Sequence, residues 1–563
     1  MTRISLAAML TALGLLSGVL PGCSSTTPRA EPEQPPDGSE TSSLTVVAEI
    51  ALERGDCRSA SESYARAAQG GDAELAKRAA QVAFSCEHLP AAWEAVQRWR
   101  ALAPDDTDAA TLYAVVALKL YKLREARGVI AQLARDGGRS SEGALSELAQ
   151  MLLQESDPAT VLAVLSPVAE GSGTSPNVLA LLADIALEAY HLERAERYAK
   201  QALARDPQAA AAKRVLIRVY VLRGDAPRAI ELAREIALAD PEGSSFELAD
   251  ALMGLERLEE ARQELERLHA EGVAQGEVER RLALLALESG DFDEAERRLT
   301  ALATSGEGTD AAIFYLAEIA EREGDYESAL AGYRRLANSQ LAITARARAA
   351  GILLERGERA EALAMLDDYA TEHPEQAFEL TLIKARLFAD HGDIESAIAL
   401  LDAALERHPG HPSLQYERAV LLERGGQLRE CLDALEKLLE ERPGDPAVMN
   451  ALGYTMADHG IELARAETLI RRALESAPDN PAMLDSLGWV RFRRGDTRAA
   501  IPILERAYAL GRDPEIAAHW GEALWASGQQ QQARTILATA LARAPRSQPL
   551  RKTIDRLLSA VNP

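Results

Sequence analysis

Residues 485–511, DSLGWVRFRRGDTRAAIPILERAYALG, contain the pattern that decides the fold. Apolar residues at spacings of three and four flank Gly495-Asp496, which is typical of two amphipathic helices joined by a tight turn. Gly495 suits the left-handed backbone that ends a helix, and the Asp496 carboxylate can accept the free amide protons that start the next one. The small side chain of Ala500 lets the two helices pack closely. This stretch therefore predicts one helix–turn–helix unit.

The same unit recurs along most of the chain. Gly-Asp also occurs at 55–56, 224–225, 290–291, 324–325 and 392–393, each time with alanine five positions after the glycine. A small residue stands at this position every 32 to 35 residues, at Ala195, Ala229, Ala261, Ala295, Ala329, Ala362, Ala397, Cys431, Ala466, Ala500 and Ala533. A regular period of this length is the mark of a solenoid. We therefore expect an all-α array of stacked helix pairs.

The spacing and the residue types resemble the tetratricopeptide repeat (TPR). The resemblance rests on three consecutive units, which contain Leu452-Gly453-Tyr454 with Ala466, Leu487-Gly488-Trp489 with Ala500, and Trp520-Gly521 with Ala533. It implies a superhelix of about eleven clear repeats over residues 178–545. Weaker copies of the pattern upstream indicate three or four degenerate helix pairs over 44–177. Residues 546–563 are expected to form a capping helix and tail that shields the last repeat.

Composition narrows the range of functions. The chain has 563 residues, of which 47% are apolar, so a folded body is expected rather than wholesale disorder. Its net charge of −25 makes nucleic acid and anionic lipid surfaces poor partners. Four cysteines are too few for a disulfide-framework fold or a multi-thiolate metal module.

The N-terminus predicts export and lipidation at Cys23. A short positive start and an apolar run to Leu20 are typical of a signal peptide, expected over residues 1–22. Leu20-Pro21-Gly22-Cys23 resembles the lipobox of bacterial lipoproteins, and Ser24 implies sorting to the periplasmic side of the outer membrane of a Gram-negative bacterium. A plain secretory peptide with an incidental cysteine is the alternative. Residues 23–43, rich in Ser, Thr and Pro, are expected to form a lipidated, disordered tether.

The sequence offers no catalytic motif. We find no phosphate-binding glycine loop, no HExxH, no GxSxG and no CxxC. His408 and His411 are the nearest approach to a metal pair, but no cysteine or carboxylate cluster stands beside them in the sequence. We therefore expect a protein that is not an enzyme and that has no cofactor and no metal.

Cys57 and Cys86 are candidates for a disulfide bond. Cys57 lies at the expected start of a second helix, and Cys86 near the end of the following first helix. Successive helices of a solenoid are antiparallel, so this start and this end should be neighbours. In an oxidising periplasm we expect a disulfide, with two free thiols as the alternative. Cys431 stands where other repeats have alanine, which indicates a buried packing residue.

The TPR resemblance also implies where a partner would bind. In TPR arrays the first helix of each pair lines the concave wall, where extended or helical peptides dock. Three of the five tryptophans fall within residues 489–525, and aromatic and arginine clusters are enriched at interfaces. The expected partner-binding residues are Tyr416, Asn450, Tyr454, Asp485, Trp489, Arg493, Glu522 and Trp525.

Two functions remain open at this point. The array length, the lipobox and the segments 487–489 and 513–522 resemble the LbcA family of outer-membrane lipoproteins. That resemblance implies an adaptor that binds a periplasmic carboxyl-terminal processing protease and delivers substrates such as peptidoglycan hydrolases. The alternative is a scaffold lipoprotein that helps to assemble an envelope export machine, such as a secretin, a pilus or a polysaccharide channel.

Overall fold

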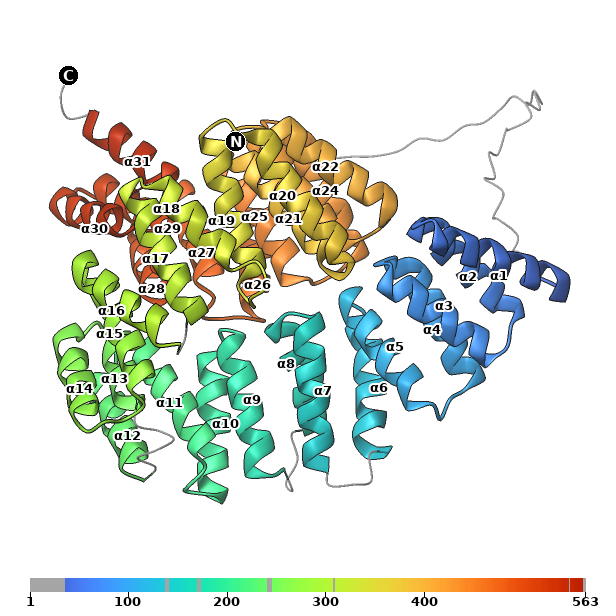
Figure 1. Ribbon diagram of the computed structural model, residues 1–563, viewed down its shortest axis with the longest axis horizontal. Helices are drawn as coiled ribbons and strands as arrows, with labels where there is room; N and C mark the ends of the chain where they lie inside the picture. Colours follow the sequence, from blue (N-terminus) through green and yellow to red (C-terminus); the bar gives the residue numbers. More distant parts are fainter. Residues whose placement is uncertain are drawn as a thin grey trace, which may run out of the picture.

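The computed structural model describes residues 36–136, 141–169, 174–239, 246–306, 309–545 and 547–559. Within these ranges the chain forms 31 α-helices and one short 3-10 helix, and it contains no β-strand (Figure 1). The predicted all-α TPR array is therefore confirmed. Cys23 and the expected signal peptide, residues 1–22, lie outside the described residues.

Four helix pairs precede the clear repeats, as the weak upstream pattern indicates. Their bounds are α1 Gly38–Glu53, α2 Cys57–Gly70, α3 Ala73–Ser85, α4 Leu89–Leu102, α5 Thr107–Lys119, α6 Leu123–Asp136, α7 Ser141–Glu155 and α8 Pro158–Ala169.

Eleven further pairs and a final single helix follow. The first six pairs are α9 Pro176–Glu188, α10 Leu192–Arg205, α11 Ala210–Leu222, α12 Ala226–Ala239, α13 Glu247–Gly254, α14 Leu258–Ala270, α15 Gln275–Ser289, α16 Phe292–Ser305, α17 Thr309–Glu323, α18 Tyr326–Arg335, α19 Ala342–Glu355 and α20 Arg359–Glu372. After the 3-10 turn η1 (Pro374–Gln376) come α21 Ala377–Asp390, α22 Ile394–Arg407, α23 Pro412–Arg424, α24 Leu428–Glu441, α25 Pro446–Asp458, α26 Leu463–Leu474, α27 Pro481–Arg493, α28 Thr497–Gly511, α29 Pro514–Ala526, α30 Gln530–Arg543 and α31 Gln548–Ser559.

The turn chemistry expected from the sequence is present in the structure. Gly495 has a φ of +87°, a backbone conformation that costs glycine little. The Asp496 side chain accepts the amide proton of Ala499 and so caps α28. Ala500 is fully buried between the helices of its pair. None of the described helices is long and apolar enough to cross a membrane.

The tether expected over residues 23–43 is too long at its C-terminal end. Helix α1 begins at Gly38, so residues 38–43 form its first turns. The Asp37 carboxylate accepts the amide protons of Ser39 and Glu40, both at 2.9 Å, and this cap lets a polar segment start the helix. The run of Ser and Thr, which favours disorder by composition, gave no sign of this cap.

The array coils so that its second half lies against its first. In Figure 1 the blue-to-green helices α1–α16 form the lower arc, and the yellow-to-red helices α17–α31 lie above it. Hydrogen bonds join residues that are about 290 to 350 positions apart, for example from Tyr121 Oη to the Gly444 carbonyl oxygen, at 2.9 Å. The superhelix therefore has two turns in contact.

Candidate functional site: an aromatic pocket on the wall of first helices

One pocket gathers several of the predicted partner-binding residues. It has a volume of about 470 Å³ and is formed by the first helices α25, α27 and α29 together with the final helix α31. Its lining consists of Tyr454, Asp458, Trp489, Phe492, Arg493, Glu515, His519, Glu522, Pro549, Lys552, Thr553 and Arg556. Three of the helices that the TPR resemblance assigns to the binding wall thus build this pocket together with α31.

The floor of the pocket is a stack of aromatic rings. The ring centroids of Trp489 and His519 are 4.1 Å apart, and those of Trp489 and Phe492 are 5.3 Å apart. Trp489 Nε1 donates to Asp458 Oδ1 at 3.0 Å, and Tyr454 Oη donates to Glu515 Oε1 at 2.8 Å. These hydrogen bonds hold the rings in place, so the floor is preformed.

A buried ion pair supports this stack. His519 Nδ1 lies 3.0 Å and 2.9 Å from the two carboxylate oxygens of Asp485, and both residues are buried. Burial alone would lower the pKa of His519, but the negative charges of Asp485, Glu515 and Asp458 outweigh it, so the pKa is raised. His519 therefore tends to carry a positive charge beneath the ring of Trp489.

The rim of the pocket carries charges of both signs. Arg493 lies over the Trp489 ring, with its guanidinium carbon 5.6 Å from the ring centroid. Glu522 on α29 pairs with Arg556 on α31, and Lys552 is exposed beside them. An aromatic floor with a mixed-charge rim suits a polypeptide, which offers apolar side chains and both kinds of charge.

Four of the eight predicted partner-binding residues line this pocket, and the other four do not. Tyr454, Trp489, Arg493 and Glu522 line the pocket together, although only 6% of Trp489 is exposed. Asp485 does not line the pocket: it is 5% exposed and lies beneath it, bonded to His519.

The other three predicted residues lie outside this pocket. Trp525 is half-buried, with the guanidinium of Arg534 on α30 at 5.1 Å from its ring centroid. Tyr416 lines a separate cavity of about 530 Å³ between the two turns, where burial raises its pKa. Asn450 is half-buried, and its Oδ1 has no hydrogen-bond partner among the described residues.

Sequence reasoning missed several residues of the site. His519 lies 34 positions after Asp485, one repeat later, so the period could have placed it on the same wall. Lys552 and Arg556 belong to α31, which the sequence indicated only as a cap. The cap therefore has a second role, because it closes one side of the pocket.

A second groove lies on the same wall in the first half of the array. Helices α9, α11 and α13 enclose about 750 Å³ there. Its lining includes the aliphatic side chains of Leu181, Val215 and Val221, together with Arg214 and Arg218. The wall of first helices thus offers two separate places where a polypeptide could dock.

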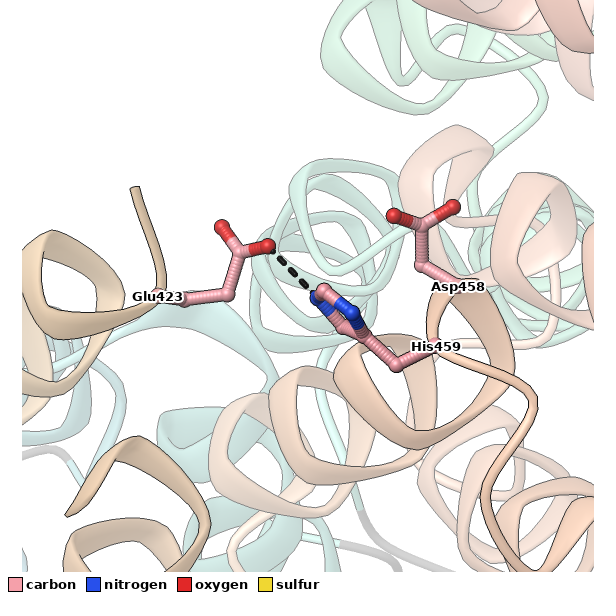
Figure 2. A group of neighbouring side chains, drawn as sticks. All are labelled: Glu423, Asp458 and His459. Carbon is pink, nitrogen blue, oxygen red and sulfur yellow. Dashed lines mark hydrogen bonds and ion pairs between the residues drawn. The ribbon is translucent and has the colours of Figure 1, made fainter. Parts of the chain in front are cut away.

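Among the described residues, one cluster has the composition of a metal site. The ligand atoms of Glu423, Asp458 and His459 lie within 4.8 Å of one another (Figure 2). His459 Nε2 is 2.9 Å from Glu423 Oε1, and Asp458 Oδ1 accepts from Trp489 with the Arg493 guanidinium 3.6 Å away. Because these contacts account for the arrangement, we assign no metal to it.

The cysteines lie away from the pocket. A disulfide joins Cys57 at the start of α2 to Cys86 at the end of α3, with their Cα atoms 5.4 Å apart. The start of α2 and the end of α3 thus lie side by side, as expected from the sequence. Cys431 is buried as a free thiol, and burial raises its pKa to about 11.

Comparison with known proteins identifies the repeat. The tetratricopeptide repeat family matches residues 181–244, 280–345, 347–412 and 462–515, and a second tetratricopeptide repeat pattern matches 388–453. Together these segments span more than half of the chain. The protein belongs to the tetratricopeptide repeat family. Repeats of this family bind other proteins and are typical of non-catalytic scaffolds.

A curated relative shares part of the array. The TPR repeat-containing protein PA4667 of Pseudomonas aeruginosa is 30% identical over 213 residues, which is 38% of this chain. The match spans 36% of the relative's own length, so about a third of that protein is covered.

Solved TPR structures are similar to this chain at low sequence identity. Yeast Tom70 is 14% identical, and the match covers 92% of this chain and 99% of Tom70 with a TM-score of 0.32. The Cut9–Hcn1 tetramer of the APC/C is 16% identical, with coverage of 92% and 96% and a TM-score of 0.31. TTC0263 of Thermus thermophilus is 23% identical, with coverage of 32% and 98% and a TM-score of 0.30.

Proposed function

We propose that this protein is a non-catalytic adaptor that holds a protease, its protein substrates, or both on the wall of first helices. The proposed partner is a periplasmic carboxyl-terminal processing protease, and the proposed substrates are peptidoglycan hydrolases. Binding both on one long array would raise their effective concentration and promote cleavage without any catalytic residue in this chain.

The pocket between α25, α27, α29 and α31 is the observation that carries this proposal. Its ring stack is held by Asp458 and by the buried Asp485–His519 pair, so little ordering is needed when a polypeptide binds. The groove on α9, α11 and α13 provides a second docking place on the same wall. Two separate places on one chain suit a protein that brings two others together.

The proposed location is the periplasmic side of the outer membrane, with the lipid on Cys23. Residues 24–37 would separate the anchor from α1, a length that reaches about 45 Å when fully extended. Cys23→Ser should move the protein from the membrane fraction to the soluble periplasmic fraction. Membrane retention of this variant would contradict lipidation at Cys23.

Purification of the full-length lipoprotein in detergent from its source bacterium tests the partner. A carboxyl-terminal processing protease should co-purify, and peptidoglycan hydrolases should accumulate in a deletion strain. An outer-membrane channel subunit as the sole partner would favour the export-scaffold alternative instead.

Charge removal at the pocket rim tests the binding place. Arg493→Ala/Lys552→Ala should weaken binding of the purified partner by about tenfold, because arginine is enriched among interface hot spots and both cations line the pocket. The matched control is Lys437→Ala/Arg472→Ala, which removes two exposed cations on the second helices α24 and α26. Equal affinity of both variants would exclude the pocket as the docking place.

A further inference from the structure

The two superhelical turns contact each other through two rows of loops between helices, which are far apart in the sequence. We call this contact the seam. One row consists of turns within helix pairs of the first half, and the other of linkers between pairs of the second half. The first row includes Glu87, Tyr121, Tyr190 and Glu256. The second includes His408, Gly444, Asp479 and Arg512, with Arg543 at the end of α30. Both rows follow the repeat period, so contacts recur along the seam.

The first contacts of the seam are hydrogen bonds to backbone carbonyl groups. His408 Nδ1 lies 2.8 Å from the Cys86 carbonyl oxygen and donates to it. Tyr121 Oη donates to the Gly444 carbonyl oxygen at 2.9 Å. The Arg442 guanidinium lies 5.5 Å from the centroid of the Tyr121 ring. The candidate metal pair of the sequence thus contributes, through His408, to a contact between turns.

Asp479 makes the most extensive contact of the seam. Its amide donates to the Tyr190 carbonyl oxygen at 2.9 Å, and its Oδ2 accepts the amide proton of Leu192, also at 2.9 Å. His191, the residue before α10, makes no side-chain cap of its own, so Asp479 caps this helix from the other turn. Asp479 is buried and is paired with Arg506.

Glu256 forms the far end of the seam. Its Oε1 pairs with the guanidinium groups of both Arg512 and Arg543. All three side chains are nearly half exposed, so solvent and salt weaken these pairs.

Backbone strain is concentrated at the seam. Among the described residues seven non-glycine residues have a positive φ, and five of them lie at the seam: Glu87, Tyr121, Tyr190, Glu256 and Arg512, with φ values of 49° to 57°. Glycine takes the equivalent turn position at Gly224 and Gly290. Except at Tyr190, where the backbone carbonyl group makes the contact, the side chain held in the left-handed region reaches the other side of the seam.

The contacts named above are polar, whereas the helix pairs are held by apolar cores. The clusters of buried apolar side chains each comprise helices that are consecutive in the sequence. One contact crosses the seam: among the described residues, the Leu510 side chain, from the second half of the array, packs against an apolar cluster of the first half. Two halves that are joined mainly by polar contacts separate more readily than two halves that share an apolar core.

We propose that the seam is a reversible latch, along which the superhelix opens and closes while every helix pair stays folded. Opening breaks the contacts of Tyr121, Asp479 and Glu256 and uncovers the start of α10. Apart from the contact of Leu510, it leaves the apolar cores intact, because those cores follow the chain from pair to pair. The latch therefore sets the spacing between the two turns.

Distance measurement between spin labels tests the latch. Labels on Arg124→Cys and Glu440→Cys, two exposed positions on opposite sides of the seam, report its width. Cys23→Ser removes one native thiol, and the other native cysteines do not compete, since Cys57 and Cys86 are bonded and Cys431 is buried. In Tyr121→Phe/Glu256→Gln/Asp479→Ala the distance distribution should shift to longer values, with helix content by circular dichroism unchanged.

A matched variant controls for the loss of the same chemical groups elsewhere. Tyr326→Phe/Glu361→Gln/Asp291→Ala removes a tyrosine hydrogen bond to Glu355, an ion pair to Arg334 and a helix cap, all between neighbours along the chain. It should keep the wild-type distances. Equal opening in this control would overturn the proposal.

A second seam variant separates opening from misfolding. Tyr121→Gly removes the contact to Gly444 and also relieves the left-handed backbone, so local folding is favoured. It too should shift the distances to longer values, by less than the triple variant. Wild-type distances in both seam variants, or loss of helix content in the triple variant, would overturn the latch.

Discussion

The first and the last helix pairs of the array are packed differently at the same position. Where the two helices of a pair cross, α1, α3 and α5 have a fully buried alanine, at Ala48, Ala80 and Ala114. At the equivalent position α25, α27 and α29 have glycine, at Gly453, Gly488 and Gly521. A Cβ atom on these glycines would lie only 2.5 to 2.7 Å from a side chain of the second helix, which is Ile470, Leu504 or Leu537.

The difference shows that the same repeat can be stabilised by different interactions at the two ends of the array. In the last pairs the missing Cβ lets a large aliphatic side chain fill the crossing, and buried ionic groups such as Asp485 and His519 are enclosed nearby. The first pairs have alanine instead of glycine at the crossing, packed against Tyr64, Val96 and Ile130. A covalent bond joins the first pair to the second. The predictions below test each of these interactions.

Loss of the disulfide should have the largest effect. Cys57→Ala/Cys86→Ala frees a loop with a sequence separation of 29 residues, which is expected to cost about 3.5 kcal/mol in the free energy of unfolding. Hydrogen exchange should show lost protection in α1–α4 and unchanged protection in α25–α30, because each pair contacts mainly its neighbours. Uniform loss along the array would mean that the two ends are not independent.

Adding a methyl group at the C-terminal crossing should have the next largest effect. In Gly488→Ala the new Cβ would lie 2.5 Å from Leu504 Cγ, so overpacking outweighs the gain in helix propensity and costs about 1 to 2 kcal/mol. Gly128→Ala in α6 is the control, because its Cβ would have no atom within 4 Å. It should stabilise its pair by about 0.5 to 1 kcal/mol. Chemical denaturation of both variants checks the signs.

The fold was predictable because each repeat encodes its own turn and crossing. The Gly495-Asp496 turn and the buried Ala500 follow from local chemistry that the period repeats eleven times. The start of α1 was missed although the Asp37 cap that decides it is periodic. Asp72 and Asp106 make the same kind of cap at α3 and α5, but the Ser- and Thr-rich composition of residues 38–43 favoured a tether.

The site was predictable only where it follows the repeat. The period placed Tyr454, Trp489, Arg493 and Glu522 on one wall, and they line one pocket. It could not show that Asp485 turns inward to His519, because this depends on which side chains fill the space beneath Trp489. The seam was also missed, since it depends on the pitch of the whole superhelix and not on any one unit.

The buried ion pair of the last repeats predicts a dependence on pH. The pKa of His519 is raised in the folded protein, so its protonation contributes stability that is fully present below about pH 6.5. That contribution is lost as the pH rises through the higher folded-state pKa. Wild-type α27–α30 should therefore be more stable than His519→Gln at pH 6, with a smaller difference at pH 9. Denaturant melts at both values check this, and His391→Gln, at an exposed position, should show no such trend.

The cap of α1 should give the smallest effect, because α1 is a terminal helix that packs mainly on α2. Asp37→Ala leaves the amide groups of Ser39 and Glu40 without an acceptor, which is expected to cost about 0.5 to 1 kcal/mol. The loss should appear as faster hydrogen exchange in residues 38–43, while α3 and α4 keep their protection. Asp37→Asn should restore most of it, since an amide oxygen also caps a helix. Exchange in residues 38–43 that is fast in the wild type and insensitive to Asp37 would mean that these residues belong to the tether after all.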